Sequence, residues 1–131
     1  MIALDTNVLI RFLVRDDHDQ AARAHALIES CAEKGEECLI TSSVLCETEC
    51  VLESVYRASR AEIANAVRML LTTPPFSPQD PAILENALQR YSKGKGDLSD
   101  YLIGECASAL GARTTYTFDR VLRNAEQFTL L

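Results

Sequence analysis

The sequence lacks the features that mark fibrous, secreted and membrane proteins. Only 5 glycines and 4 prolines occur in 131 residues, which is too few for a fibrous or disordered chain. The 5 cysteines form no Cys-x-x-Cys pair and follow no secretion signal, which favours reduced thiols over a disulfide framework. No apolar run approaches the ~20 residues of a membrane helix. We therefore expect an ordered, cytoplasmic protein that does not use a membrane.

Positive charge is also scarce. The chain has 13 lysines and arginines against 19 acidic residues, a net charge of −6 at pH 7. This excludes a protein covered by basic surface, so a nucleic-acid partner would be contacted locally, by a basic rim or through a metal. Apolar residues make up 47% of the chain, enough for one core. We predict a single domain over residues 1–131.

Short apolar runs alternate with helical patterns. The runs predict strands at "IAL" (2–4), "CLIT" (38–41), "TTYTF" (114–118) and "FTLL" (128–131). The helical patterns cover residues 6–14, 19–35, 42–56, a segment from 59, 82–91, 99–111 and a short stretch in 119–127. Strands separated by helices predict an α/β fold, a three-layer αβα arrangement with a central, mostly parallel sheet.

Several residues predict where these elements end. Ser59 and Glu62 form a capping-box pattern, and Gly35 and Gly111 are typical helix stops. The stretch "TTPPFSPQDP" predicts a loop with a short extended segment, and "SKGKGD" (92–97) predicts a flexible connection.

Two aspartates follow predicted strands. Asp5 comes after the first strand and Asp119 after the strand at 114–118. Sites in open parallel sheets form beyond the carboxyl ends of the strands, and an unpaired carboxylate is costly to bury. Either residue could instead cap the helix that follows it. Two such aspartates, on a chain with further acids in suitable places, favour a functional site.

The further acids lie on helices. Glu47 and Glu49 flank opposite edges of the apolar stripe of helix 42–56, and periodicity does not choose between them. Asp97 and Asp100 flank the start of the helix at 99–111, where the helix dipole favours negative charge. Capping explains Asp97 better than Asp100, which lies at the edge of its helix's apolar stripe.

Converging carboxylates repel one another unless they are protonated or share a cation. Because no paired Cys or His accompanies these acids, the donors favour Mg²⁺ or Mn²⁺ over Zn²⁺. A carboxylate-held metal of this kind is the usual device for phosphodiester hydrolysis.

Four segments then resemble a known family. "DTNVLIR", "SVLCETECVL", "DLSDYLIGECASALGA" and "TTYTFDRVL" follow one another in the order found in PIN domains. Over nearly its whole length the chain resembles the VapC-type toxin ribonucleases of bacterial toxin–antitoxin systems. The resemblance assigns seven residues: the acidic quartet Asp5, Glu47, Asp100 and Asp119, which holds Mg²⁺ or Mn²⁺, the additional acid Asp97, the small hydroxyl residue Thr117, and the polar residue Asn7.

The resemblance also implies an activity and partners. It implies a cytoplasmic, metal-dependent endoribonuclease with an RNA substrate, a homodimeric state, and an antitoxin whose C-terminal segment covers the acidic groove. Lys93, Lys95 and Arg120 could contact RNA phosphates, as could Arg11 and Arg15, but each could equally be a solvated charge. Cys46 and Cys50 share a helix face away from the apolar stripe and could lie in a subunit interface.

Other protein classes fit less well. A haloacid-dehalogenase-like phosphatase needs a second aspartate two residues after the first, where this chain has Asn7. A receiver domain needs an acidic pair after its first strand and a late lysine, and the chain has neither. The remaining alternative is a catalytically inactive PIN-like RNA-binding or scaffold module. Loss of one acid of the quartet would mark such a module, and none is missing.

Overall fold

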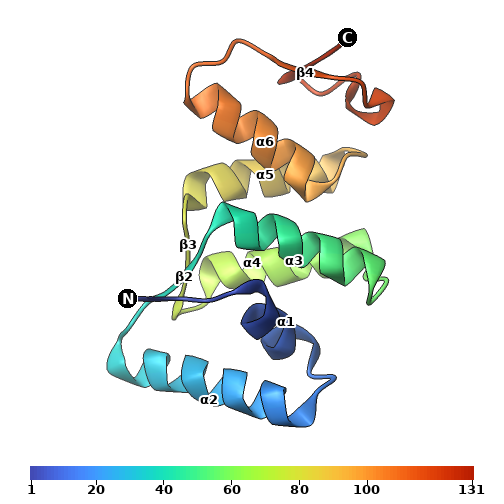
Figure 1. Ribbon diagram of the computed structural model, residues 1–131. Coiled ribbons are helices and arrows are strands. Elements are labelled where there is room, and N and C mark those ends of the chain that lie inside the picture. Colours follow the sequence, from blue (N-terminus) through green and yellow to red (C-terminus); the bar gives the residue numbers. More distant parts are fainter. The chain divides into compact units, whose positions relative to one another are not determined.

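A computed structural model describes residues 1–131 (Figure 1). The elements are β1 (Ile2–Ala3), α1 (Thr6–Val14), α2 (His18–Lys34), β2 (Cys38–Ile40), α3 (Ser42–Ser54), α4 (Arg60–Thr72), β3 (Phe76–Pro78), α5 (Pro81–Lys93), α6 (Leu98–Ala109), β4 (Thr115–Thr117), the 3₁₀ turn η1 (Arg120–Leu122) and β5 (Phe128–Leu130). They form two compact units, Met1–Pro81 and Ala82–Leu131.

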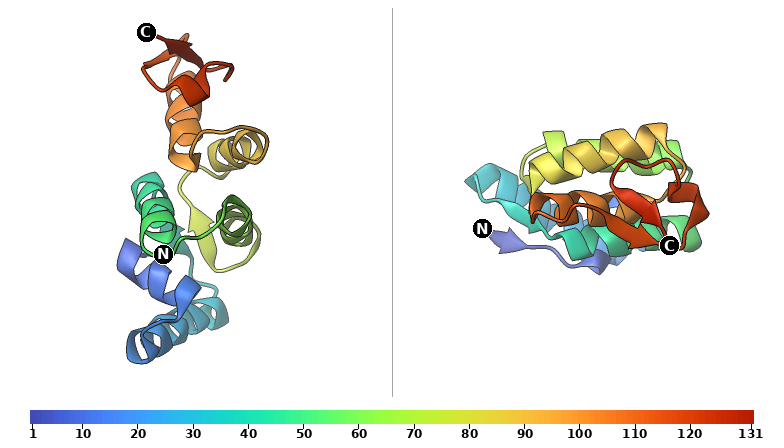
Figure 2. Two further views of the ribbon diagram at one scale, coloured as in Figure 1. Left: turned by 90° about the vertical axis from the view of Figure 1, so that its right-hand side faces the viewer. Right: turned by 90° about the horizontal axis from the view of Figure 1, so that it is seen from above.

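The N-terminal unit contains a three-stranded parallel sheet in the order β1-β2-β3. Ile2 pairs with Cys38, and Cys38 pairs with Phe76. The strands run between α3 and α4, so helices cover both faces of the sheet (Figure 2). Parallel strands that are covered on both faces need continuous apolar runs, and Cys38 and Ile40 on the central strand are fully buried.

The C-terminal unit contains α5, α6 and a two-stranded parallel sheet of β4 and β5. Its core includes Leu84 from α5, Leu98 and Tyr101 from α6, and Leu122 from η1, each at most 4% exposed. Leu122 therefore anchors the turn that follows β4 in the core of this unit.

The expected α/β fold with parallel strands is confirmed, with one sheet in each unit. The capping box at the start of α4 is also confirmed, because the Ser59 hydroxyl accepts from the Glu62 N–H at 3.1 Å and Glu62 accepts from the Ser59 N–H at 3.0 Å. Gly35 ends α2 in the left-handed conformation with φ of 66°. No helix has the combined length and apolar character needed to cross a membrane.

One predicted segment differs from the structure, and a second makes contacts that the sequence does not reveal. Residues 119–127 form only the short turn η1, because their backbone bonds span three residues, as from the Leu122 N–H to the Asp119 carbonyl. The connection at 92–97, which the sequence predicts to be flexible, makes hydrogen bonds with the helices that it joins. The Gly94 N–H bonds the Arg90 carbonyl at 2.8 Å, and the Gly96 N–H bonds the Tyr101 hydroxyl at 3.1 Å.

Candidate acidic site

Asp5 occupies the N-cap position of α1 but does not cap it. Its backbone is extended, with φ of −80° and ψ of 161°, and its carbonyl accepts the first helical bond from the Leu9 N–H. Its side chain makes no capping hydrogen bond and is exposed. The simple capping role allowed by the sequence is therefore not observed, and the carboxylate is left to face a ligand or solvent.

Glu47 is tied to the segment that contains Asp5. Its carboxylate accepts a hydrogen bond from the Thr6 hydroxyl at 2.6 Å, across 41 residues of sequence. Thr6 itself is only 6% exposed, so the packed first residue of α1 positions a carboxylate on α3. Glu49, which the pattern could not separate from Glu47, is 4% exposed, whereas Glu47 is exposed.

Thr6, which holds the Glu47 carboxylate, was not named by the sequence interpretation. Its only signal was its place in "DTN", directly between Asp5 and Asn7. Asn7 is exposed and lines a small pocket that α1 and α2 form around Arg11.

In the C-terminal unit, Asp97 and Asp100 form the start of α6. Asp97 is the N-cap residue, and its N–H donates to the Asp100 carboxylate at 2.9 Å. The sequence interpretation assigned capping chiefly to Asp97, but Asp100 supplies the reciprocal half of a capping box.

Asp119 is fixed at the end of β4 by two hydrogen bonds. Its carboxylate accepts from the Val121 N–H at 3.0 Å and so caps η1. Its own N–H donates to the Thr117 hydroxyl at 3.0 Å. Thr117 therefore positions the backbone of Asp119, and its supporting role in the site stays a prediction.

The three aspartates of this unit interact electrostatically. Burial raises the pKa of Asp100 above its usual value, and the charges of Asp97 and Asp119 raise it further. The hydrogen bond from the Asp97 N–H opposes this rise. Asp100 is thus a half-buried carboxylate in negative surroundings, the setting in which a cation is most useful.

The structure thus forms two local groups of candidate residues. Asp5, Thr6 and Glu47 belong to the N-terminal unit, and Asp97, Asp100 and Asp119 to the C-terminal unit. No set of three or more His, Cys, Asp or Glu side chains lies close enough to hold a metal ion. The convergence of the acidic quartet therefore stays a prediction. The donors themselves are carboxylate oxygens, which suit a hard divalent cation.

Two arginines near Asp5 in sequence have structural partners. Arg11 bonds Gln20 at 2.7 Å and Asp16 at 2.9 Å. Arg15 lies 3.4 Å from a ring nitrogen of His25. Because these contacts join α1 to its neighbours, they disfavour both arginines as RNA contacts.

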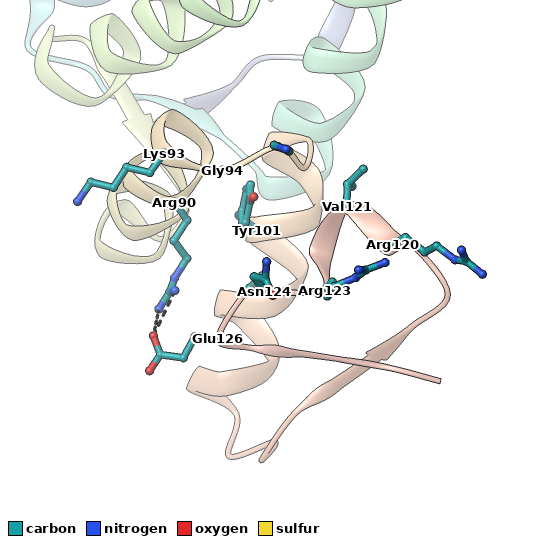
Figure 3. A pocket seen from close by; sticks show the side chains of 11 residues that line it. Arg90, Lys93, Gly94, Tyr101, Arg120, Val121, Arg123, Asn124 and Glu126 are labelled. Carbon is teal, nitrogen blue, oxygen red and sulfur yellow. Dashed lines mark hydrogen bonds and ion pairs between the residues drawn. The ribbon is translucent and has the colours of Figure 1, made fainter.

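Basic residues gather instead in the C-terminal unit. They line a pocket of about 760 Å³ that we call the basic pocket (Figure 3). Its lining residues are Arg90, Lys93, Gly94, Lys95, Tyr101, Arg120, Val121, Arg123, Asn124, Ala125 and Glu126. Lys93, Lys95 and Arg120, which the sequence offered only as possible phosphate contacts, are all among them.

Comparison with known proteins agrees with the resemblance noted in the sequence. The model of the PIN domain family matches residues 2–127. A protein named VapC ribonuclease from Aquifex aeolicus (strain VF5) is 28% identical over 120 residues, which are 92% of this chain and 88% of that protein.

Proposed function

Because this chain belongs to the PIN domain family, we propose that it is a metal-dependent endoribonuclease that hydrolyses RNA phosphodiester bonds. The observation that supports this most is the condition of its acids. All four acids of the expected quartet are present, Asp5 makes no capping bond, and Glu47 is held by a buried hydroxyl.

Asp5, Glu47, Asp100 and Asp119 are the residues we propose to hold Mg²⁺ or Mn²⁺. When bound, such an ion lowers the pKa of a water and offsets charge on the phosphate. The chain's own residues orient the donors. The Thr6 hydroxyl fixes Glu47, and the Val121 N–H fixes Asp119.

The remaining supporting residues act on the backbone and the local charge. Thr117 holds the Asp119 main chain, and Asp97 adds a negative charge beside Asp100. Asn7 is exposed two residues after Asp5, and by the resemblance it is a supporting polar residue.

The biological role we propose is that of a toxin in a toxin–antitoxin pair. The similarity to a protein named VapC ribonuclease supports this role. By the same resemblance, the protein is a cytoplasmic homodimer that an antitoxin inhibits. The family match spans both compact units, which supports treating residues 1–131 as one domain.

The alternative is a catalytically inactive RNA-binding or scaffold module. Metal-dependent cleavage separates the two directly. We expect purified protein to cut RNA in Mg²⁺ or Mn²⁺ and to stop when a chelator removes the metal. Cleavage that persists after verified metal removal would refute the metal mechanism, and RNA binding without cleavage would support the inactive module.

A further inference from the structure

The two compact units differ in charge. The N-terminal unit contains 7 lysines and arginines against 13 acids, and the C-terminal unit contains 6 of each. The whole negative surplus of the chain therefore belongs to the N-terminal unit. All the C-terminal cations except Arg113 line the basic pocket.

Most of the cations in the pocket lack an acidic partner. Arg90 is neutralised, because it pairs with Glu105 at 2.5 Å and with Glu126 at 3.4 Å. No salt bridge within the chain involves the other four, which are Lys93, Lys95, Arg120 and Arg123. Four cations that form no salt bridge within the chain, gathered around one hollow, attract an anion.

The cations are spread along the pocket. Figure 3 shows Arg90 and Lys93 on one side of Tyr101. Arg120 and Arg123 lie on its other side. Donors that converge on one point bind a single phosphate best. Cations that are spread apart instead match the successive phosphates of a nucleic-acid strand.

The segment that bears Lys93 and Lys95 packs against a buried side chain. The Tyr101 hydroxyl holds the Gly96 N–H, and Tyr101 is only 4% exposed. A Cβ on Gly94 would lie 2.0 Å from that hydroxyl, so the loop with Lys93 and Lys95 packs directly on the Tyr101 ring.

The pocket borders the aspartates in sequence and in space. Lys95 lies two residues before Asp97, and Arg120 directly follows Asp119. A Cβ on Gly96, between Lys95 and Asp97, would lie 3.2 Å from the Asp100 carboxylate. A polyanion held in the pocket would therefore extend beside Asp97, Asp100 and Asp119.

We propose that the basic pocket binds the phosphodiester backbone of single-stranded RNA next to the cleavage point. The proposal rests on the proposed ribonuclease function and names the residues that hold its substrate: Lys93, Lys95, Arg120 and Arg123. Because the contacts are to phosphates, they add affinity but do not distinguish base sequence.

The test measures binding apart from cleavage. A 5′-hydroxyl, single-stranded RNA oligonucleotide with a fluorescent label is titrated with protein in chelator, at several salt concentrations. Such RNA offers internal phosphodiesters and no terminal phosphate. The variants are Lys93→Gln/Arg120→Gln and Lys95→Gln/Arg123→Gln, and the matched control is Arg113→Gln, the one cation of this unit outside the pocket.

Each double variant is expected to bind more weakly than wild type on oligonucleotides of unrelated sequence. The slope of log affinity against log salt should become shallower by about 1.4, because each lost phosphate contact on a single strand removes about 0.7. The Arg113→Gln protein should keep the wild-type affinity and slope. Unchanged slopes in both double variants, or no binding by folded wild-type protein, would overturn the proposal. An acidic peptide is titrated as a second probe. If the double variants lose binding to this peptide but keep wild-type RNA binding, the pocket binds a protein ligand and the proposal is overturned.

Cleavage of the same RNA in Mn²⁺ separates this proposal from the proposed function. A pocket that only holds substrate predicts a raised KM with little change in kcat in the double variants. If wild type cleaves the RNA and the double variants show an unaltered KM, the pocket proposal is rejected while the ribonuclease function stands. If RNA binding depends on the pocket but wild type does not cleave the RNA, the ribonuclease function is rejected while the pocket proposal stands.

Discussion

The hydrogen bond from the Thr6 hydroxyl orients the Glu47 carboxylate. Replacing Thr6 with Val keeps the shape of this buried residue but removes its donor. Because loss of a partner to a metal-binding side chain typically costs 10–100-fold, we expect Thr6→Val to lower metal affinity or RNA cleavage by about that factor. Thr6→Ser should retain most of both, since it keeps the hydroxyl. Equal loss in the two variants would assign Thr6 a packing role only.

The raised pKa of Asp100 predicts a pH-dependent stability. The folded protein binds this proton more tightly than the unfolded chain, so the Asp100 charge destabilises the fold increasingly as pH rises through the raised pKa. The penalty is absent at acidic pH below the usual carboxyl range. Asp100→Asn removes the charge and keeps an oxygen for the Asp97 N–H.

In chelator near neutral pH, the Asp100→Asn protein should therefore melt higher than wild type, and the difference should shrink on acidification. A melting series over pH, with Glu85→Gln as an exposed-acid control from the same unit, measures this. A variant that melts lower at every pH would leave Asp100 only its capping role.

At the scale of elements, the loop between α5 and α6 depends on space rather than on backbone flexibility. A Cβ on Gly96 would lie 2.6 Å from a Leu122 methyl, and Leu122 is 1% exposed and cannot withdraw. We expect Gly96→Ala to destabilise the protein by ~1–3 kcal/mol, the usual cost of overpacking. Denaturant unfolding should show the loss, while Lys95→Ala on the same loop, at an exposed position, should leave stability unchanged. Similar unfolding curves for Gly96→Ala and Lys95→Ala would mean that the loop shifts to accommodate the added Cβ.

Elements with a local sequence signal were predictable, whereas features that depend on contacts between separate segments were not. Helix starts were predictable where the signal is local, as in the capping box of Ser59 and Glu62. The "KGKG" stretch was predicted to be a flexible connection. The structure adds that Gly94 and Gly96 lie against Tyr101 and Leu122, a packing contact that composition does not reveal. The stretch 119–127 was expected to be a helix, but Asp119 caps a tight turn instead.

The candidate site is a prediction that draws on both local and distant features. Asp5 and Asp119 follow from their places at strand ends, which are local features of the chain. Periodicity did not separate Glu47 from Glu49, and the resemblance selected Glu47. The structure adds a difference that periodicity cannot reveal, because Glu49 is 4% exposed whereas Glu47 is exposed and accepts the bond from Thr6.

At the scale of the whole molecule, the family resemblance predicts a homodimer. Light scattering at micromolar concentration should give twice the mass of one chain. A monomer mass under those conditions would contradict this part of the account and leave the proposed chemistry intact.

The central claim is that acids from two distant parts of the sequence hold one metal. The direct measurement is Mn²⁺ affinity, by calorimetry, of wild type, Asp5→Asn and Asp119→Asn, with melting curves to verify folding. Both variants should stay folded, because Asp5 is exposed and makes no capping bond and asparagine can still cap η1 in place of Asp119. We predict that each substitution alone weakens binding by about tenfold or more, since a direct ligand should matter at least as much as its partners. Wild-type affinity in either folded variant would contradict the account.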